Sequence, residues 1–281
     1  MAVVAPFFVI LHVLMGAFRI LCFGSGSSGN CFYFQNDEGA FLIDAGVGIS
    51  KMRKYFAMYD IVPQSISGVF LTHDHIDHVR CACSFAKRAG IPIYATESVW
   101  QGMDINPVIR TKIPIENRRI IQKNMPMDFL GCRLTAFDVP HDSSDNVGYY
   151  ICYKNIRLVH VTDDGSMTDE IQSYIAQANC LTIESNYDED MLRNGAYPTY
   201  LKTRIFGTNG HLSNREAAET IYRHYKHLSH VWLCHISANN NTPQKALDEV
   251  VGLLRKKGVA EQDFPVLTPL NRTEPTGFFD L

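Results

Sequence analysis

The sequence of 281 residues lacks three features that would assign it quickly to a class of protein. It has no excess of positive charge, because 26 Lys and Arg against 29 Asp and Glu give a formal net charge of −3. No overall basic field therefore collects nucleic acid, although bound divalent metals can supply local positive charge to a nuclease. None of the eight cysteines forms the C-x-x-C spacing of a structural zinc site. No low-complexity linker or solenoid repeat divides the chain, so its 46% hydrophobic residues are available for an ordinary globular core.

The first 18 residues are apolar but fit neither a membrane span nor a signal peptide. A proline, a histidine and a glycine interrupt the run, which is shorter than the roughly 20 residues that cross a bilayer. A signal peptide normally begins with Lys or Arg, whereas the first basic side chain here is Arg19. We expect residues 1–18 to be an extension, either a spurious start or a disordered segment, with a weak membrane anchor as the alternative. Residues 19–281 are expected to form a single domain.

Short apolar runs separated by Gly, Ser, Pro and Asn predict a strand-rich fold with helices between the strands. A capping box from Ser213 to Glu216 predicts a helix that runs to about His227. Two strand-rich halves with helices between them predict an α/β fold, a four-layer αββα sandwich in which the halves share one core. The expected strands are Arg19–Phe23, Asn30–Gln35, Ala40–Asp44, Gly68–Thr72, Ile93–Ala95, Cys132–Val139, Val147–Tyr153, Arg157–Thr162, Cys180–Glu184 and Val231–His235, and the other expected helices are Ile49–Tyr59, Val79–Ala89, Asp169–Ala178 and one opened by Thr242.

The strongest functional signal is the segment Leu71–His78, which reads Leu-Thr-His-Asp-His-Ile-Asp-His. Because side chains alternate along an extended segment, His73 and His75 point to one side and can meet one cation. Asp77 and His78 fall at the start of the next helix and point toward a neighbouring cation. Neutral imidazole and carboxylate are ligands for zinc, iron or manganese. The alternative, a solvated His-rich loop, rarely follows a buried strand directly.

This segment resembles the H-x-H-x-D-H signature of the metallo-β-lactamase superfamily, and candidates for the remaining ligands follow in the order of that superfamily. His141 in Val-Pro-His-Asp resembles the third histidine of the first metal. Asp163 in His-Val-Thr-Asp resembles the aspartate that bridges two metals, and His235 after Val-Trp-Leu-Cys resembles the last histidine of the second metal. The resemblance implies two divalent metal ions, which we expect to be Zn, Mn or Fe.

Three further motifs resemble the YycJ-like (WalJ-type) branch of that superfamily. They are Phe-Gly-Ser-Gly-Ser-Ser-Gly-Asn at 23–30, Leu-Ile-Asp-Ala-Gly at 42–46, and His-Ile-Ser with Asn-Asn-Thr-Pro at 235–243. The likeness covers almost the whole chain from Arg19 onward and implies a hydrolase of phosphodiesters that acts as a DNA exonuclease. One position departs from the family pattern, since Asn239 stands where relatives commonly have a glutamate. The second metal site therefore lacks a carboxylate that would tune its affinity.

The motif at 23–30 also matches G-x-G-x-x-G, but a dinucleotide-binding loop opens a helix and this one continues as a strand. A β-turn is the simpler interpretation of the motif. The alternative is a phosphate cradle, in which backbone N–H groups and the hydroxyls of Ser27 and Ser28, with Asn30 beside them, bind the substrate near the metals.

Glu184 and His211 resemble a pair found in tRNA-processing relatives within the superfamily. Glu184 ends the strand Leu-Thr-Ile-Glu, and His211 precedes the capped helix. The resemblance implies that His211, held by Glu184, protonates the departing oxygen, because an expelled sugar alkoxide is a poor leaving group. Asp77 is expected to orient the attacking hydroxide that the two metals share. A structural histidine and a surface glutamate are the alternative.

These residues together predict a dinuclear metal-dependent hydrolase whose partner is a nucleic acid substrate, DNA before RNA, cleaved in a 5′–3′ exonuclease-like manner. One alternative is a thiolester or lactone hydrolase of the same fold, because the same hydroxide attacks carbonyl carbon. An alternative of another class is a metal-stabilised binding or regulatory module with little turnover. Free buried thiols favour a reducing, cytoplasmic location, and we expect no stable membrane association.

Overall fold

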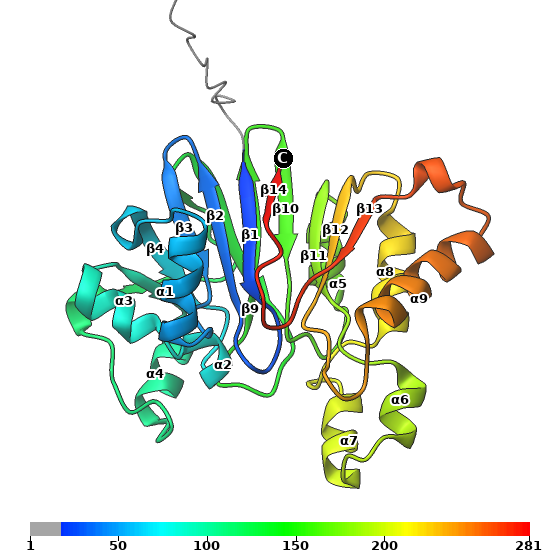
Figure 1. The fold of residues 1–281 in the computed structure, drawn as a ribbon, viewed down its shortest axis with the longest axis horizontal. Helices are drawn as coiled ribbons and strands as arrows, with labels where there is room; N and C mark the ends of the chain where they lie inside the picture. The colour runs from blue at the N-terminus through cyan, green and yellow to red at the C-terminus, as the bar shows by residue number, and fades with distance from the viewer. Residues whose placement is uncertain (1–17) are drawn as a thin grey trace, which may run out of the picture.

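The computed structural model describes residues 18–281, so the predicted N-terminal extension lies outside the described residues except for Phe18. Phe18 is buried and its ring stacks on that of Tyr153, with 5.5 Å between the ring centroids. Two seven-stranded sheets pack face to face, and helices cover the outer face of each (Figure 1). The predicted four-layer αββα sandwich is confirmed.

The first sheet carries the N-terminal half of the chain and one strand from the C-terminus. In spatial order it contains β14 (Phe278–Asp280), β1 (Arg19–Gly24), β2 (Cys31–Asn36), β3 (Gly39–Ile43), β4 (Ile66–Phe70), β5 (Ile93–Ala95) and β6 (Arg118–Ile120). The helices on its outer side are α1 (Ile49–Met58), α2 (Ile76–Val79), α3 (Ala82–Ala89) and α4 (Glu97–Ile105), with short 3-10 turns at Pro63–Ser65 and Ile115–Asn117.

The second sheet carries the C-terminal half. In spatial order it contains β13 (Val266–Pro269), β12 (His230–Cys234), β11 (Cys180–Glu184), β10 (Ile156–His160), β9 (Val147–Tyr153), β8 (Cys132–Asp138) and β7 (Met127–Phe129). Its outer side is covered by α5 (Asp169–Ile175), α8 (Asn214–His224) and α9 (Pro243–Lys256), with a 3-10 turn at Glu261–Asp263. Two short helices, α6 (Glu189–Asn194) and α7 (Thr199–Phe206), project from one end of the sandwich (Figure 1).

Alternation along β1 shows how one strand serves two apolar layers. Ile20 and Cys22 lie in the layer between the sheets, whereas Leu21 and Phe23 pack under the helices of the first sheet. The layer between the sheets contains residues of both, so the two halves share one core as predicted. The C-terminal segment joins the sheets as well, because β13 pairs with β12 and β14 pairs with β1.

All ten predicted strands are present, but one predicted helix begins later than predicted and several elements were missed. The helix predicted over Val79–Ala89 is interrupted, because the amide of Cys81 donates to the Ala45 carbonyl at 2.7 Å and α3 begins only afterwards. All eight cysteines are free thiols. Between residues 18 and 281, no helix combines the length and apolar character that a membrane crossing requires. The elements that the sequence did not predict are α4, α6, α7, β6, β7, β13 and β14.

Candidate metal centre

Loops at one end of the sandwich bring the predicted metal-binding side chains together. The segment His73–His78 follows β4 in the first sheet, whereas His141, Asp163 and His235 follow β8, β10 and β12 in the second. Glu184 is the last residue of β11, which is the parallel neighbour of both β10 and β12. Because the carboxyl ends of parallel strands meet at one edge of a sheet, their terminal residues are delivered to one place.

Three carboxylate or imidazole residues of this centre have left-handed backbone. Asp44, Asp163 and His235 have φ of 60°, 51° and 51°. Non-glycine residues seldom adopt this conformation, and such strain clusters at functional sites. Asp44 and His235 come directly after β3 and β12. The sharp turn at each strand end therefore belongs to the construction of the centre.

The first donor set consists of three imidazoles. His73, His75 and His141 each offer a ring nitrogen, and these atoms lie within 4.8 Å of one another. The Nδ1 of His141 donates to the Gly210 carbonyl at 3.0 Å, and the Nδ1 of His73 lies 3.0 Å from the hydroxyl of Thr72. Because the Nδ1 atoms of His73 and His141 are engaged outward, their Nε2 atoms remain for a shared ligand.

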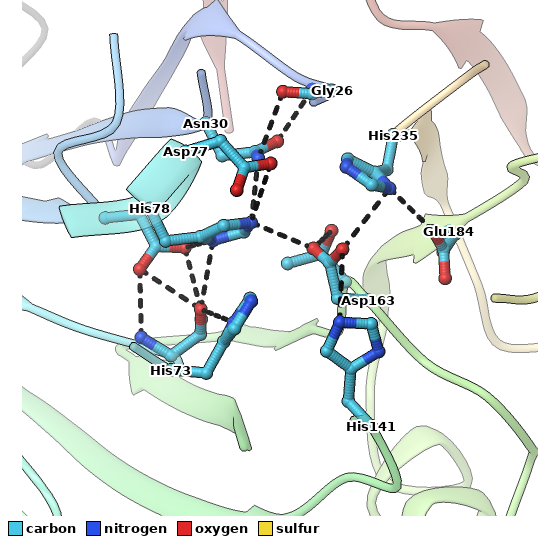
Figure 2. Close-up of polar contacts among 12 residues, drawn as sticks. Gly26, Asn30, His73, Asp77, His78, His141, Asp163, Glu184 and His235 are labelled. Atoms are coloured by element: carbon cyan, nitrogen blue, oxygen red, sulfur yellow. Dashed lines mark hydrogen bonds and ion pairs between the residues drawn. The ribbon is translucent and has the colours of Figure 1, made fainter. Parts of the chain in front are cut away.

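Asp163 lies at the middle of the centre, between the two sheets' contributions (Figure 2). Its Oδ2 is 3.1 Å from His78 Nε2. Its Oδ1 is 3.8 Å from His141 Nε2 and 3.5 Å from His235 Nδ1. One carboxylate thus faces both donor sets, which is the position of a bridging ligand.

The second donor set is built around His78 and His235. Asp77, His78 and His235 offer ligand atoms within 4.8 Å of one another. The Nδ1 of His78 donates to Asp44 Oδ2 at 2.7 Å, and its Nε2 lies 2.8 Å from Asn30 Nδ2 and 3.9 Å from Asp77 Oδ2. The set combines nitrogen and oxygen donors next to the first one.

Glu184 holds two histidines with one oxygen. Its Oε1 accepts from His211 Nδ1 at 2.9 Å and lies 2.7 Å from His235 Nδ1. Its Oε2 accepts from the backbone amides of Asp164 and Leu212. Despite burial, His211 lowers the pKa of Glu184 to about 2, and against its own burial Glu184 raises the pKa of His211 to about 9. The two side chains therefore form a buried ion pair, and the sequence-based alternative of a surface glutamate is wrong because Glu184 is fully buried.

The donor atoms fit a divalent cation. His73 Nε2 and His235 Nε2 are buried and have no hydrogen-bond partner among the described residues. Burial and the neighbouring His78 hold the pKa of His73 well below its ordinary value, so the ring is neutral and offers a lone pair. Buried polar atoms rarely stay unpaired, and a cation bound in each donor set would satisfy the nitrogen of that set. Imidazole and carboxylate donors suit zinc, manganese and iron.

The three predicted substrate-binding residues are placed differently from one another. Ser27 and Ser28 are exposed, and the hydroxyl of Ser27 accepts from Arg272 Nη2 at 3.3 Å. Asn30 is fully buried, and its amide bonds to Gly26 and faces His78. The 24–30 loop is therefore joined through Asn30 to the segment His73–His78, hereafter the metal loop, while Ser27 and Ser28 face solvent.

Several residues that position the ligands were not predicted. Asp44 is fully buried and accepts from the backbone amide and hydroxyl of Thr72 as well as from His78. The sequence did carry a signal for Asp44, namely a carboxylate directly after an apolar strand. The histidine cluster was predicted from the same pattern. Asn186 donates to the His235 carbonyl at 2.9 Å, and the hydroxyl of Ser25 accepts from the His235 amide at 2.8 Å. Ser25 lies in the 23–30 motif but received no role, and nothing in the local sequence marked Asn186.

Gly46 shows how closely the chain approaches itself behind the metal loop. A Cβ at this position would lie 1.5 Å from the Asp77 carbonyl oxygen. The amide of Gly46 donates to Asn30, and the amide of Asn30 donates to the Asp77 carbonyl. The backbone of three segments is stacked here, and only glycine fits.

A family model described as the beta-lactamase superfamily domain matches residues 40–236. The chain belongs to this superfamily. It is 32% identical to Exodeoxyribonuclease YycJ of Bacillus anthracis over 83% of this chain and 88% of that protein. It is 30% identical to Exodeoxyribonuclease WalJ of Streptococcus pneumoniae over 82% of this chain and 85% of that protein. The chain is a metal-dependent hydrolase of the YycJ-like branch, as the sequence motifs predicted.

The superfamily fold is also found among solved structures. Zn²⁺-bound PqqB from Methylobacterium extorquens superposes with a TM-score of 0.67 at 18% identity, over 92% of this chain and 99% of that one. At this identity the likeness establishes the fold of this superfamily member and nothing finer.

Proposed function

We propose that this hydrolase is a dinuclear metal-dependent phosphodiesterase that cleaves DNA in the manner of a 5′–3′ exonuclease. The observation that carries the proposal is the position of Asp163 between two adjacent donor sets. The two relatives named as exodeoxyribonucleases support DNA as the substrate. The eight free thiols, seven of them buried, support a reducing compartment such as the cytoplasm.

The residues divide into two sets of ligands. His73, His75 and His141 would hold one cation, and Asp77, His78 and His235 the other, with Asp163 between them. A divalent pair supplies a water of lowered pKa and neutralises charge on a phosphoryl oxygen. The imidazole and carboxylate donors support zinc, manganese or iron as the metal.

Asp77 would orient the attacking water. Its carboxylate lies 3.9 Å from His78 Nε2 and its side chain is 17% exposed, whereas that of His78 is fully buried. Its carbonyl is fixed by the amide of Asn30 at 2.8 Å. A partly exposed carboxylate on a fixed backbone can accept a hydrogen bond from the water and keep it aimed at phosphorus.

His211 would return the proton to the departing oxygen. It lies at the edge of the centre, with its side chain 14% exposed, and its Nδ1 is held by Glu184 at 2.9 Å. With Nδ1 bonded inward, Nε2 is the ring nitrogen that can donate to substrate. A deoxyribose alkoxide needs such a proton, so this group matters most for a natural phosphodiester.

Turnover of bis-p-nitrophenyl phosphate by the metal-loaded protein tests the chemistry. We expect hydrolysis that is stimulated by manganese and absent from the His75→Ala variant. A panel of single-stranded DNA, duplex DNA, RNA and a thiolester then identifies the substrate, and end-labelled DNA gives the polarity. Hydrolysis of the thiolester alone would replace the proposal with the other enzyme class. Full metal occupancy without turnover of any substrate would show a binding module.

A further inference from the structure

Two hollows lie beside the metal loop, His73–His78, and the residue Arg80 that follows it. One of about 250 Å³ is lined by Ser28 and Gly29 of the 24–30 loop, by the start of α1 and by Arg272. The other, of about 390 Å³, is lined by Ile76 and Val79 of α2, by α3 and by residues 108–111. Ile76 lies between the metal-ligand candidates His75 and Asp77, so the second hollow begins at the metal loop itself.

Arg80 lines both hollows and therefore lies at their junction. It follows α2 directly, and its guanidinium donates to the Ser28 carbonyl at 3.1 Å. This bond ties the junction to the 24–30 loop, whose Asn30 faces His78. Arg80 thus lines both hollows and lies two residues after His78 in the chain.

The charge of these hollows is of one sign. Neither lining contains an Asp or Glu. Among residues 18–281, none of the six cations in the two linings has a carboxylate within 4.0 Å, although the chain as a whole carries a net charge of −3. These six residues, hereafter the cationic track, are Lys51, Arg80, Lys87, Arg88, Arg110 and Arg272.

A hollow on the other half of the molecule differs from the track, because its lining contains both cations and carboxylates. The groove between α8 and α9 has four cations, and Glu219, Asp248 and Glu249 lie among them. There the cations are largely balanced, and Arg215 pairs with Glu219 at 3.5 Å. In the track no such compensation exists, so its charge is available to an anionic partner.

We infer that the cationic track binds the sugar–phosphate backbone of a single DNA strand and leads it past the metal loop, with Arg80 contacting the phosphate nearest the centre. The inference rests on the proposed nuclease function and adds the strand's path. A polyanion is the partner that matches a run of unpaired cations spread over two hollows that share Arg80, whereas a single small anion would occupy only one. The exposed Ser27 and Ser28 lie beside the first hollow, where their hydroxyls can bond to phosphate oxygens.

The test is binding of a phosphorothioate single-stranded oligodeoxynucleotide, which resists hydrolysis, to the metal-loaded protein by fluorescence anisotropy across a salt series. The triple variant Lys87→Ala/Arg88→Ala/Arg110→Ala should bind about 10- to 100-fold more weakly at 0.1 M salt. The slope of log K against log salt should become shallower by about 2, because each single-strand phosphate contributes about 0.7. Arg272→Ala should weaken binding through the other hollow.

A matched variant removes the same charge elsewhere. Arg223, Lys226 and Lys256 are exposed on α8, just after it and on α9, at the opposite end of the molecule from α3 (Figure 1). Their triple alanine variant should bind the oligonucleotide like the wild type. The variant Lys87→Arg/Arg88→Lys/Arg110→Lys, which keeps the three charges, should also bind like the wild type. Equal weakening by both alanine triples, or by neither, would overturn the track. Bis-p-nitrophenyl phosphate turnover by the wild type reports separately on the nuclease proposal, so failure of one inference is distinguishable from failure of the other.

Discussion

The two halves of the metal centre are held in different ways. In the half from the first sheet, the Thr72 hydroxyl lies 3.0 Å from His73 Nδ1 and 3.2 Å from His78 Nδ1, and Asp44 accepts from both Thr72 and His78. In the half from the second sheet, one oxygen of Glu184 serves both His211 and His235. Two linked side chains, Thr72 and Asp44, therefore support the first half, whereas one carboxylate supports both His211 and His235 in the second half.

The difference also separates the roles of the two halves. In the first half the histidines are all candidates for metal binding, and only Asp77 has a second proposed role, that of orienting the attacking water. The second half joins a candidate ligand, His235, to the proposed proton donor, His211, through Glu184. A change at Glu184 therefore affects both metal affinity and proton transfer, and a change at Asp44 should affect metal alone.

The largest expected effect comes from the residue that both halves share. Asp163→Asn keeps the shape of the side chain but removes its charge, so both metals and all turnover should be lost together. Metal content by mass spectrometry and bis-p-nitrophenyl phosphate hydrolysis measure the two effects. Asp138→Asn is the control, because Asp138 lies on the surface and pairs with Lys123. Retention of two metals in the Asp163 variant would contradict a bridging position.

His211→Ala should lower the rate on DNA by about 100- to 10,000-fold while leaving metal content unchanged. The rate on bis-p-nitrophenyl phosphate should fall far less, because p-nitrophenolate leaves without a proton. The ratio of the two losses is the measurement. Equal losses on both substrates would show that His211 acts on metal or structure and not as the proton donor.

Replacing each supporting carboxylate, Glu184 or Asp44, by its amide tests whether the two halves of the centre differ. Glu184→Gln and Asp44→Asn should each lower metal affinity by about 10- to 100-fold, since each orients one ligand histidine. Only Glu184→Gln should also lose rate preferentially on DNA when metal is saturating. Isothermal titration with manganese and the substrate ratio distinguish the variants. Identical behaviour of the two would remove the proposed asymmetry between the halves.

Gly46→Ala tests the backbone that supports the first half. Its Cβ would overlap the Asp77 carbonyl, so the free energy of unfolding should fall by about 3 kcal/mol. Gly48→Ala is the matched control, because nothing lies within 4 Å of a Cβ there and its φ is −58°. Thermal unfolding of both apo variants measures the difference. A Gly46 variant as stable as the Gly48 variant would show that the loop can move apart.

Local sequence pattern predicted the half of the centre that is contiguous. An apolar strand followed by His73–His78 carries its own geometry, because alternation and the next helix turn determine where the side chains point. The order of the two sheets is not encoded in any short window. Grouping Asp163 and His235 with these residues therefore rested on resemblance to a family, and Asp44, 34 residues away from His78, received no role.

The missed edge strands lacked the signals that prediction needs, whereas the N-caps of α4 and α6, Thr96 and Asp188, were present in the sequence and were overlooked. β6, β7 and β14 are three residues long and partly exposed at or near sheet edges, which is too short for any periodicity to appear. The break between α2 and α3 depends on the bond from Cys81 to Ala45, a contact from a distant strand end. Strand alternation and helix capping can be recognised in a short segment of sequence. Contacts between segments that are distant in the chain cannot.

Anomalous diffraction from crystals grown with manganese or zinc tests the central claim most directly. The claim predicts two peaks about 3.5–4 Å apart, one against His73, His75 and His141 and the other against Asp77, His78 and His235, with Asp163 touching both. A single peak, or a pair of peaks that leaves Asp163 without a metal contact, would contradict it.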